Sequence, residues 1–334
     1  MTTELTKVQK AMSYVNTVAN KITTDSREQR WLNNVRANKE TYAAGNATLR
    51  GLTAFIVCAG PSLEKNAEQL KKMGRLGIII CVDAALRHLL EVGVKPDYCI
   101  SIDSDGRCMR FIEGLDTEGI TLICMTTAAP EVVQFWKGPR YFVGANGGGD
   151  GKLFAMSRQV KVERDLKVGD YLDPIDDISI EFPGVIATLN CGGNVSTAAA
   201  SFAYEIIRAC KLVFVGADFS WPEDPKGDSV FYAGDHYKDM AKERKTSDRV
   251  LSHPGQDDEQ LSTNMSLFAF KQWHGGFAGR CPNTHVNASE GGILGIGNDK
   301  YAVDGSCGSG EKLSGWEFLT LAEAIEKYTK RASE

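Results

Sequence analysis

The stretch that decides the fold is an apolar run that changes abruptly into small residues, Ala54-Phe55-Ile56-Val57-Cys58-Ala59-Gly60-Pro61-Ser62-Leu63. Its first half is typical of a strand that is buried on both faces. Ala59 and Gly60 are small enough to let another molecule approach the backbone, Pro61 suits a first helical turn, and Ser62 offers a hydroxyl. N–H groups at a helix start attract anions. The pattern therefore predicts a strand, a tight turn and a helix, with either a phosphate or an ordinary connection at the turn.

Strand and helix patterns alternate regularly on the C-terminal side of this stretch. We expect strands over residues 52–58, 76–82, 98–102, 120–125 and 141–143, with helices over 62–73 and 84–92 and another opened by Pro130. Such alternation is typical of parallel strands joined by right-handed helical crossovers. The predicted fold is α/β, a Rossmann-like open and mostly parallel sheet with helices on both faces.

The flanking segments predict a simple organisation around one central domain. Residues 1–50 carry apolar residues at helical spacing and are expected to form a helical leader. Residues 51–300 are expected to form the Rossmann-like domain, with an insertion or lid at about 144–190 and a variable loop at about 219–285. Residues 301–334 end in a closing helix, expected over 316–328.

Composition predicts an ordinary cytoplasmic protein. The chain has 334 residues, of which 43% are hydrophobic, and a formal charge of −5, which gives no support to a general nucleic-acid-binding surface. One basic run, residues 238–249, is interpreted as a solvated helix face. The nine cysteines show no paired spacing and are expected to be reduced and mostly buried. We expect neither a signal peptide nor a membrane span.

Carboxylates stand at the ends of two predicted strands. Asp83 follows a very apolar run and could either accept hydrogen bonds from a ribose or base, or cap the next helix. Asp103 and Asp105 close the following strand, and a pair of this kind could hold a Mg²⁺ that bridges phosphates. Ligands of open parallel sheets collect at the carboxyl ends of the strands, so these side chains are candidates for a binding site.

A second unit of similar design follows. The small-residue turn Asn190-Cys-Gly-Gly-Asn-Val-Ser-Thr197 leads into a helix pattern over 198–210, and the strand pattern over 212–218 ends in Gly216 and Asp218. His236 lies in the polar loop that comes next. Its ordinary pKa, about 6.5, suits proton transfer near neutrality, so it is a candidate general base, although a surface histidine is the simpler interpretation.

Taken in order, these motifs resemble a known family. The stretches that carry the resemblance are 59–63, 82–86, 95–97 with 101–103, 193–196, 215–218 and 287–292. They are similar to the family that contains the motility-associated-factor (Maf) glycosyltransferases of flagellin and the archaeal 6-hydroxymethylpterin diphosphokinases, and residues 31–38 resemble the leader of that family. The Gly60-Pro61-Ser62 turn also resembles the nucleotide-binding turn of bacterial sialyltransferases that use a CMP-linked sugar and a histidine base. The loop over 219–285 departs from the pattern, so sugar and acceptor do not carry over.

The resemblance implies a transferase with a nucleotide donor. The implied donor-binding residues are Ala59, Gly60, Pro61, Ser62, Asp83, Asp103, Gly193, Asn194, Ser196 and Asp218. His236 and Asp103 are the implied catalytic residues, and Asp103 and Asp105 the implied ligands of a Mg²⁺. Our first interpretation is a glycosyltransferase whose donor is a nucleotide-activated, CMP-linked sugar. The alternatives are ATP- and Mg²⁺-dependent diphosphate transfer to a hydroxymethylpterin, and a nucleotide-binding module without catalysis. The acceptor, whether glycan, protein or small molecule, the need for a metal and the presence of a homo-oligomer stay open.

Overall fold

A parallel sheet forms the centre of the molecule. The computed structural model describes residues 30, 34, 38, 52–74, 76–146, 159–161, 179–181, 185–222, 231–234, 237, 250–257, 259–281, 284–297 and 310–330. Within these residues the largest sheet has nine strands, and every neighbouring pair is parallel. In their order across the sheet the strands are β14 (Trp316–Phe318), β13 (His285–Asn287), β9 (Lys211–Val215), β1 (Thr53–Val57), β2 (Gly77–Val82), β3 (Tyr98–Ser101), β4 (Thr121–Met125), β5 (Arg140–Asn146) and β8 (Val185–Asn190).

The strand order reverses between β1 and β9. From β1 the chain adds β2, β3, β4, β5 and β8 in one direction, then returns to the other side of β1 and adds β9, β13 and β14 in the opposite direction. In open sheets such a reversal separates the connections onto two faces and opens a crevice at the carboxyl ends of the strands. The ends of β1 and β9 therefore define where a ligand is expected.

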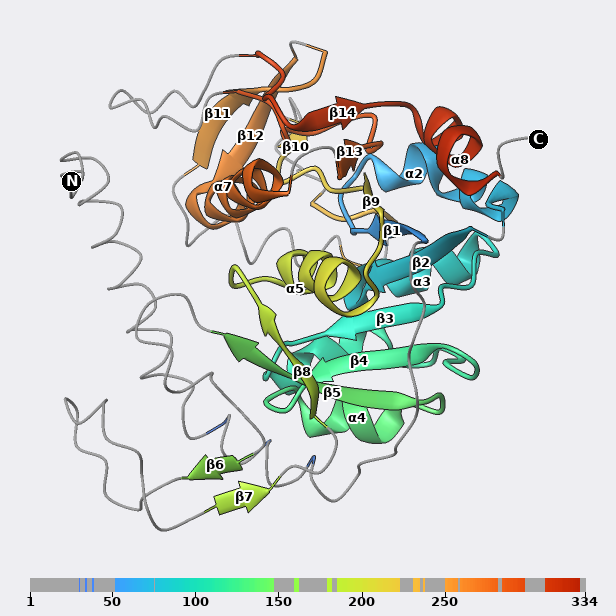
Figure 1. The fold of residues 1–334 in the computed structure, drawn as a ribbon, viewed down its shortest axis with the longest axis vertical. Coiled ribbons are helices and arrows are strands. Elements are labelled where there is room, and N and C mark those ends of the chain that lie inside the picture. Colours follow the sequence, from blue (N-terminus) through green and yellow to red (C-terminus); the bar gives the residue numbers. More distant parts are fainter. Residues whose placement is uncertain are drawn as a thin grey trace, which may run out of the picture.

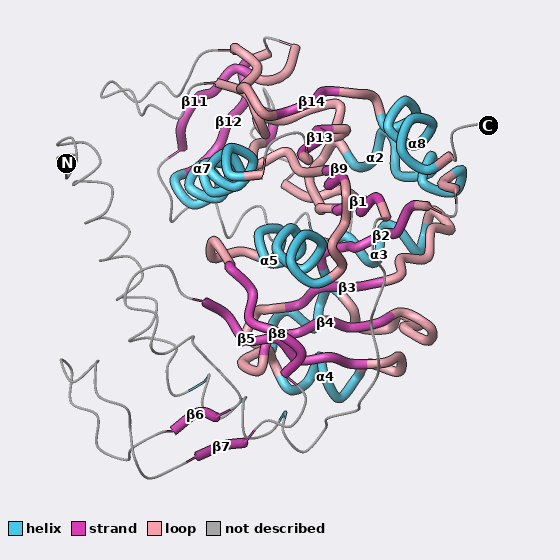
Figure 2. The backbone as a smooth tube through the Cα atoms, viewed as in Figure 1, coloured by secondary structure: helices cyan, strands magenta, loops and turns pink. Residues whose placement is uncertain are grey.

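Helices cover both faces of the sheet, as the handedness of the crossovers requires (Figures 1 and 2). One face carries α3 (Asp83–Glu91) and α4 (Pro130–Phe135), and the other carries α5 (Val195–Ser201) with α7 (Met265–Arg280) packed beside it. The short α2 (Leu63–Asn66) continues as a 3-10 turn over Ala67–Lys72, against which α8 (Leu321–Thr329) packs. A second 3-10 turn, Gly106–Phe111, follows β3. The predicted Rossmann-like fold is confirmed.

The central strands are buried because both faces of the sheet are covered. All five residues of β1 and five of the six residues of β2 are buried, which accounts for their unbroken apolar runs. The eight described cysteines are free thiols, and six of them are buried. Cys307 lies outside the described residues. Across the described ranges, no helix has both the length and the apolar character needed to cross a membrane.

Several elements differ from the sequence-based expectation. The helix expected over 62–73 changes into a 3-10 turn after Asn66, and the helix expected over 198–210 is α-helical only from Val195 to Ser201 before a π turn at Phe202–Ile206. The closing helix begins at Leu321 instead of 316, because Trp316–Phe318 pair with β13 as an edge strand. Gly315, at φ +93°, separates this strand from the preceding chain, and Thr320 and Glu323 form the capping box that starts α8.

The two segments expected to be irregular contain regular structure. Within the expected lid at 144–190, β8 belongs to the main sheet, and β6 (Gln159–Lys161) pairs with β7 (Ser179–Glu181). Within the expected variable loop at 219–285, β10 (Trp221–Pro222), β12 (Gln260–Asn264) and β11 (Val250–Pro254) form an antiparallel sheet that precedes α7. The basic run at 238–249 lies outside the described residues. So does the expected leader, apart from Arg30, Asn34 and Asn38, which are helical.

A buried tryptophan offers a test at the amino ends of the strands, which we call the amino edge. This edge lies opposite the carboxyl ends, where a ligand is expected and which we call the ligand edge or carboxyl edge. Trp136 Nε1 donates a 2.8 Å hydrogen bond to the carbonyl of Ile120, directly before β4, and both residues are buried. Trp136→Phe removes this donor and leaves the carbonyl without it. We expect the free energy of unfolding to fall by about 1–3 kcal/mol in urea denaturation. An unchanged midpoint would show that the bond contributes nothing to stability.

Candidate functional site

The turn after β1 is bonded to the end of β9 at the reversal of strand order. The N–H of Gly60 donates to the carbonyl of Gly216 at 2.8 Å. The N–H of Ser62 donates to Asp218 Oδ2 at 2.7 Å, and the Ser62 hydroxyl donates to Asp218 Oδ1. Ser62 and Asp218 are 3% and 5% exposed, so this contact is closed to solvent.

The anion at the start of α2 is therefore a carboxylate of the chain itself. The sequence predicts an anion at this turn, and Asp218 fills that position with two hydrogen bonds from Ser62. The Ser62 atoms that we expected to meet a phosphate are already bonded, and α2 has only four residues. We therefore no longer place the donor phosphate at Ser62. Gly60 and Pro61 are half-buried, and Ala59 is buried.

Gly60 is small because the chain itself approaches it. A Cβ added at Gly60 would lie 2.6 Å from the Gly216 carbonyl oxygen and 2.7 Å from Asp218 Cγ. The sequence predicts that another molecule can approach the backbone here. On the side where a Cβ would project, the space is filled by the residues at the end of β9, and contact of Gly60 with a donor remains a prediction.

The motif at 287–292 closes the same junction from the other side. The N–H of Ile293 donates to the Asp218 carbonyl at 2.8 Å, and the N–H of Ala217 donates to Ser289 Oγ at 3.0 Å. Glu290 Oε1 accepts from Asn66 Nδ2 at 2.9 Å and from the N–H of Leu321 at 3.0 Å. Three motifs that carry the family resemblance thus meet in one buried junction, which indicates a structural role for much of that resemblance.

Asp83 is buried at the end of β2. Its Oδ2 accepts from the Ser101 hydroxyl at 2.8 Å, and its Oδ1 accepts from the N–H of Ala84 at 2.9 Å in the first turn of α3. Burial raises the pKa of Asp83 from 3.8 to about 6, although both hydrogen bonds act in the other direction. The structure shows that the Asp83 carboxylate is bonded at the start of α3. Contact of this residue with a nucleotide donor remains a prediction.

Asp103 and Asp105 lie at the end of β3 in different environments. Asp103 is exposed, and its Oδ1 accepts from the N–H of Asp105 at 3.1 Å. Asp105 Oδ2 accepts from Arg30 at 2.9 Å and from the Arg107 side chain at 3.0 Å, and Asp105 Oδ1 accepts from the N–H of Arg107. The hydrogen bond from the Arg107 side chain is the largest cause that lowers the pKa of Asp105 to about 2. An exposed carboxylate therefore stands beside a carboxylate already held by two guanidinium groups.

The carboxylates of Asp103 and Asp105 fit a magnesium site only in part. Mg²⁺ in nucleotide sites is held by one or two carboxylates together with phosphates and water. The Asp103 carboxylate can serve as one such ligand, whereas Asp105 is engaged by Arg30 and Arg107. Over the ranges that the structure describes, no three His, Cys, Asp or Glu side chains are grouped to hold a metal ion.

Of the predicted donor-binding residues at the start of α5, Asn194 caps the helix. Asn194 Oδ1 accepts from the N–H of Thr197 at 3.1 Å and from the Ser196 hydroxyl at 3.0 Å, while exposed Gly193 has φ +98°. Ser196 also contacts His274 Nε2 at 3.0 Å. These bonds account for the small and polar residues of the turn, and donor contact remains a prediction.

His236, the candidate base, lies outside the described residues. Three other histidines, His253, His274 and His285, are buried, and desolvation lowers their pKa values to about 4, 3 and 4. Their burial gives them no access to a donor at the carboxyl edge.

Sequence reasoning missed the basic and amide side chains around the end of β3. Arg107 comes two residues after Asp105, and Arg30 and Asn34 come from the leader. A signal was present, because Arg30, Asn34 and Asn38 recur at intervals of four and share one face of a helix.

A substitution at Gly60 tests the junction. We expect Gly60→Ala to lower the free energy of unfolding by about 1–3 kcal/mol, because the new methyl group overlaps the Gly216 carbonyl. Gly279→Ala in α7 is the matched control. A Cβ there meets nothing within 4 Å, so that variant should match or exceed the wild type in urea denaturation. Equal stability of both variants would contradict the close approach at Gly60.

The buried carboxylate predicts a pH dependence. Burial raises the pKa of Asp218 from 3.8 to about 6, so between these values the folded protein binds more protons than the unfolded chain. The contribution of Asp218 to stability is largest below pH 3.8 and is lost as pH rises through about 6. When the pH is lowered from 7 to 5, the free energy of unfolding of the wild type should rise by about 1 kcal/mol more than that of Asp218→Asn. Comparing the two proteins cancels the titration of the buried histidines, and parallel pH curves would refute the prediction.

Comparisons with known proteins agree with this architecture. Among solved structures, the Maf glycosyltransferase from Magnetospirillum magneticum AMB-1 is similar, with a TM-score of 0.53 and 18% sequence identity. The match covers 87% of this chain and 38% of that protein, so it shows a shared fold alone. A comparison with curated protein sequences found no match. Residues 29–224, more than half of the chain, match the family model described as 6-hydroxymethylpterin diphosphokinase MptE-like, and the protein belongs to that family.

Proposed function

We propose that the protein is a transferase that binds a nucleotide-linked donor at the carboxyl edge of the nine-stranded sheet, and that its donor is a nucleotide-activated sugar. The observation that carries this proposal is the end of β3, where the exposed Asp103 carboxylate accepts from the N–H of Asp105, whose side chain is paired with the guanidinium groups of Arg30 and Arg107. Acidic and basic groups at one strand end suit a ligand that carries both hydroxyls and phosphate. The family and the Maf-like fold support the same reaction class.

The donor phosphate is proposed to lie at the end of β3 instead of at the turn after β1. Arg30 and Arg107 have side chains that are 46% and 73% exposed while they contact Asp105. A guanidinium has five N–H donors, so it can contact a carboxylate and a phosphate together. Asp103 then remains available for a sugar or ribose hydroxyl. A CMP-linked sugar, with a single phosphate, suits this small basic cluster.

His236 remains the proposed general base. Its described neighbours contact the ligand edge, because the N–H of Ala233 donates to the Ala59 carbonyl at 2.9 Å and the N–H of Gly234 donates to Glu64 Oε1 at 2.6 Å. Tyr237 packs edge-on against Phe111, with ring centroids 5.1 Å apart. The imidazole would take the proton of the acceptor hydroxyl as that oxygen attacks the donor's anomeric carbon. The bond between that carbon and the phosphate oxygen would break, and CMP would leave with the negative charge on its phosphate.

Because the described thiols are free, we also propose a reducing compartment, the cytoplasm.

Diphosphate transfer from ATP is the second candidate, and the family description favours it. In that case Asp103 would be the residue of this chain that holds Mg²⁺, and the ion would neutralise charge on the phosphates. Arg30 and Arg107 would contact the same phosphates. The two candidates differ in their need for a metal, because a CMP-sugar carries one phosphate and can react without one.

Binding and turnover measurements test the proposal. Thermal shift with CMP, UDP, GDP and ATP, each with and without Mg²⁺, should show stabilisation by CMP without a metal. Asp103→Asn and Arg107→Ala should weaken CMP binding by about tenfold, which corresponds to about 1.4 kcal/mol. Lys137→Ala is the control, because exposed Lys137 follows α4 at the amino ends of the strands and, within the described residues, forms an ion pair with Asp116. His236→Ala should lower donor hydrolysis, measured as free CMP released from a CMP-sugar, by about 10²–10⁴-fold with little change in donor affinity.

Three results would change the assignment. Stabilisation by ATP only in the presence of Mg²⁺ would favour diphosphate transfer. Binding of a nucleotide without turnover of any nucleotide sugar or ATP would favour a module without catalysis. Full hydrolysis activity in His236→Ala would remove the base assignment.

A further inference from the structure

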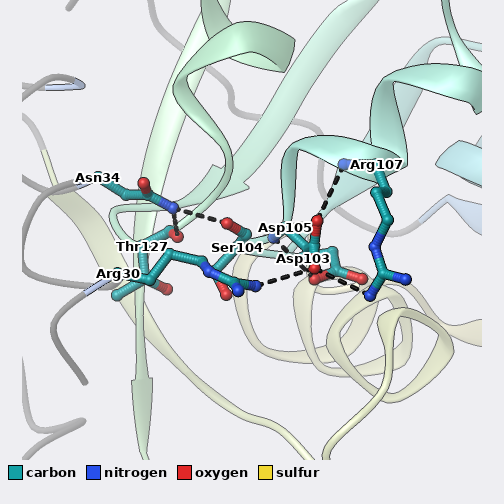
Figure 3. A network of polar contacts seen from close by, with 7 residues as sticks. All are labelled: Arg30, Asn34, Asp103, Ser104, Asp105, Arg107 and Thr127. Carbon is teal, nitrogen blue, oxygen red and sulfur yellow. Dashed lines mark hydrogen bonds and ion pairs between the residues drawn. The ribbon is translucent and has the colours of Figure 1, made fainter. Parts of the chain in front are cut away.

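Three residues of the leader lie against the ligand edge of the sheet. Arg30, Asn34 and Asn38 are helical and four residues apart, so they share one face of a helix. Arg30 is exposed, whereas Asn34 and Asn38 are 7% and 0% exposed. Figure 3 shows Arg30 and Asn34 directed at the residues that follow β3 and β4.

Asn34 joins two loops through one amide group. Its Nδ2 donates to the carbonyls of Ser104 and Thr127, each at 3.0 Å (Figure 3). Asn38 Nδ2 donates to the carbonyls of Thr126 and Ala128 at 3.1 and 2.9 Å. All four carbonyls lie beyond the last residues of β3 and β4, where the sheet ladder has ended. The leader therefore holds together two loops that no longer pair as strands.

Asp103 lies between these bonds. Its own carbonyl accepts from the N–H of Ala129 at 2.8 Å, and the next residue, Ser104, is the one bonded to Asn34. Asp105, two residues after Asp103, is bonded to Arg30. The chain at Asp103 and in the two residues after it is thus held by contacts with the leader or with the loop that the leader holds.

The chemistry of the amides suits a position beside carboxylates. A primary amide supplies two N–H donors without a net charge, whereas a lysine or arginine in the same place would attract the Asp103 carboxylate. Arg30 is the only positive side chain on the described part of this helix face, and it is paired with Asp105. Its charge therefore offsets the repulsion between Asp103 and Asp105. The leader can therefore order the loop without an ammonium or guanidinium group at positions 34 and 38 that would pair with the Asp103 carboxylate.

We infer that Asn34, assisted by Asn38 and Arg30, is a positioning residue that holds Asp103 in place for the donor, so that the leader helix completes the binding site. This inference rests on the proposed function, because it takes Asp103 to contact the donor. It goes beyond that function in assigning a role to the N-terminal segment, which precedes the first strand of the sheet.

The test compares Asn34→Leu with two matched variants. Asn34→Leu replaces the amide with an apolar side chain of similar size and so removes both N–H donors. Asn38→Leu removes the bonds to the carbonyls of Thr126 and Ala128 in the β4 loop, and Trp136→Phe removes a buried donor to a carbonyl at the opposite edge. Hydrogen exchange of the amides at 103–107 and 126–129 and the dissociation constant for CMP are measured for each. Asp103→Asn serves as the reference for loss of the contact itself.

We expect faster exchange in both loops and about tenfold weaker CMP binding for Asn34→Leu, the equivalent of about 1.4 kcal/mol. Asn38→Leu should speed exchange mainly at 126–129 and weaken binding less. Trp136→Phe should lose comparable stability, with CMP affinity within about twofold of the wild type. If Asn34→Leu does not fold, Arg30→Gln, at an exposed position, should still speed exchange at 103–107, and unchanged exchange there would overturn the positioning role. Exchange is the deciding measurement for this variant, because Arg30 is itself proposed to contact the donor phosphate.

The two ideas fail in distinguishable ways. If the wild type binds none of the nucleotides, the proposed function fails, while exchange at 103–107 and 126–129 still decides whether the leader orders these loops. If Asp103→Asn weakens binding and Asn34→Leu binds CMP like the wild type, the positioning role is overturned. Unchanged exchange at both loops in a folded Asn34→Leu protein would overturn it as well.

Discussion

The hydrogen-bonded contact between Ser62 and Asp218 is the constraint on which the ligand edge depends. It lies where the strand order reverses, and it joins the turn after β1 to the end of β9. Burying a carboxylate is costly, and two hydrogen bonds from Ser62 offset part of that cost. The motif at 287–292 then packs on the Asp218 backbone, so three distant segments share one junction.

This junction changes where the chemistry is expected. An anion-binding turn is a common feature of nucleotide-binding folds, but here the anion is internal. Asp83 and Asp218 are buried, bonded to serine hydroxyls and raised in pKa, whereas Asp103 is exposed at the neighbouring β3 end. The buried carboxylates are bonded to other parts of the chain, whereas the exposed Asp103 carboxylate is accessible to a ligand. The basic side chains of Arg30 and Arg107 are paired with Asp105 at the same strand end, and it is there that we propose the donor phosphate binds.

Much of the sheet could be predicted because its signals are local. The apolar runs of β1, β2 and β4 are buried on both faces, so their composition alone distinguishes them from surface strands. Elements that depend on distant partners were missed or assigned to the wrong class. Trp316–Phe318 have a helical pattern but pair with β13, and α7 mixes buried residues such as Phe268 and Lys271 with polar positions, so it lacks a clear apolar stripe.

The sequence by itself determined the succession of strand, tight turn and helix at residues 53–66, because φ preferences, side-chain size and apolar runs act within a few residues. It also placed Asp83 and Asp103 at strand ends, since parallel strands end on one edge. Only the tertiary structure decided which polar groups form hydrogen bonds with other parts of the chain and which stay accessible to a ligand. Ser62 and Asp218 are 156 residues apart, and Asn34 and Thr127 are 93 apart, so their contacts exist only once the chain has crossed the sheet. A local pattern can show that an N–H group needs an acceptor, but the acceptor is chosen by whichever distant carboxylate or carbonyl the fold brings within hydrogen-bonding distance.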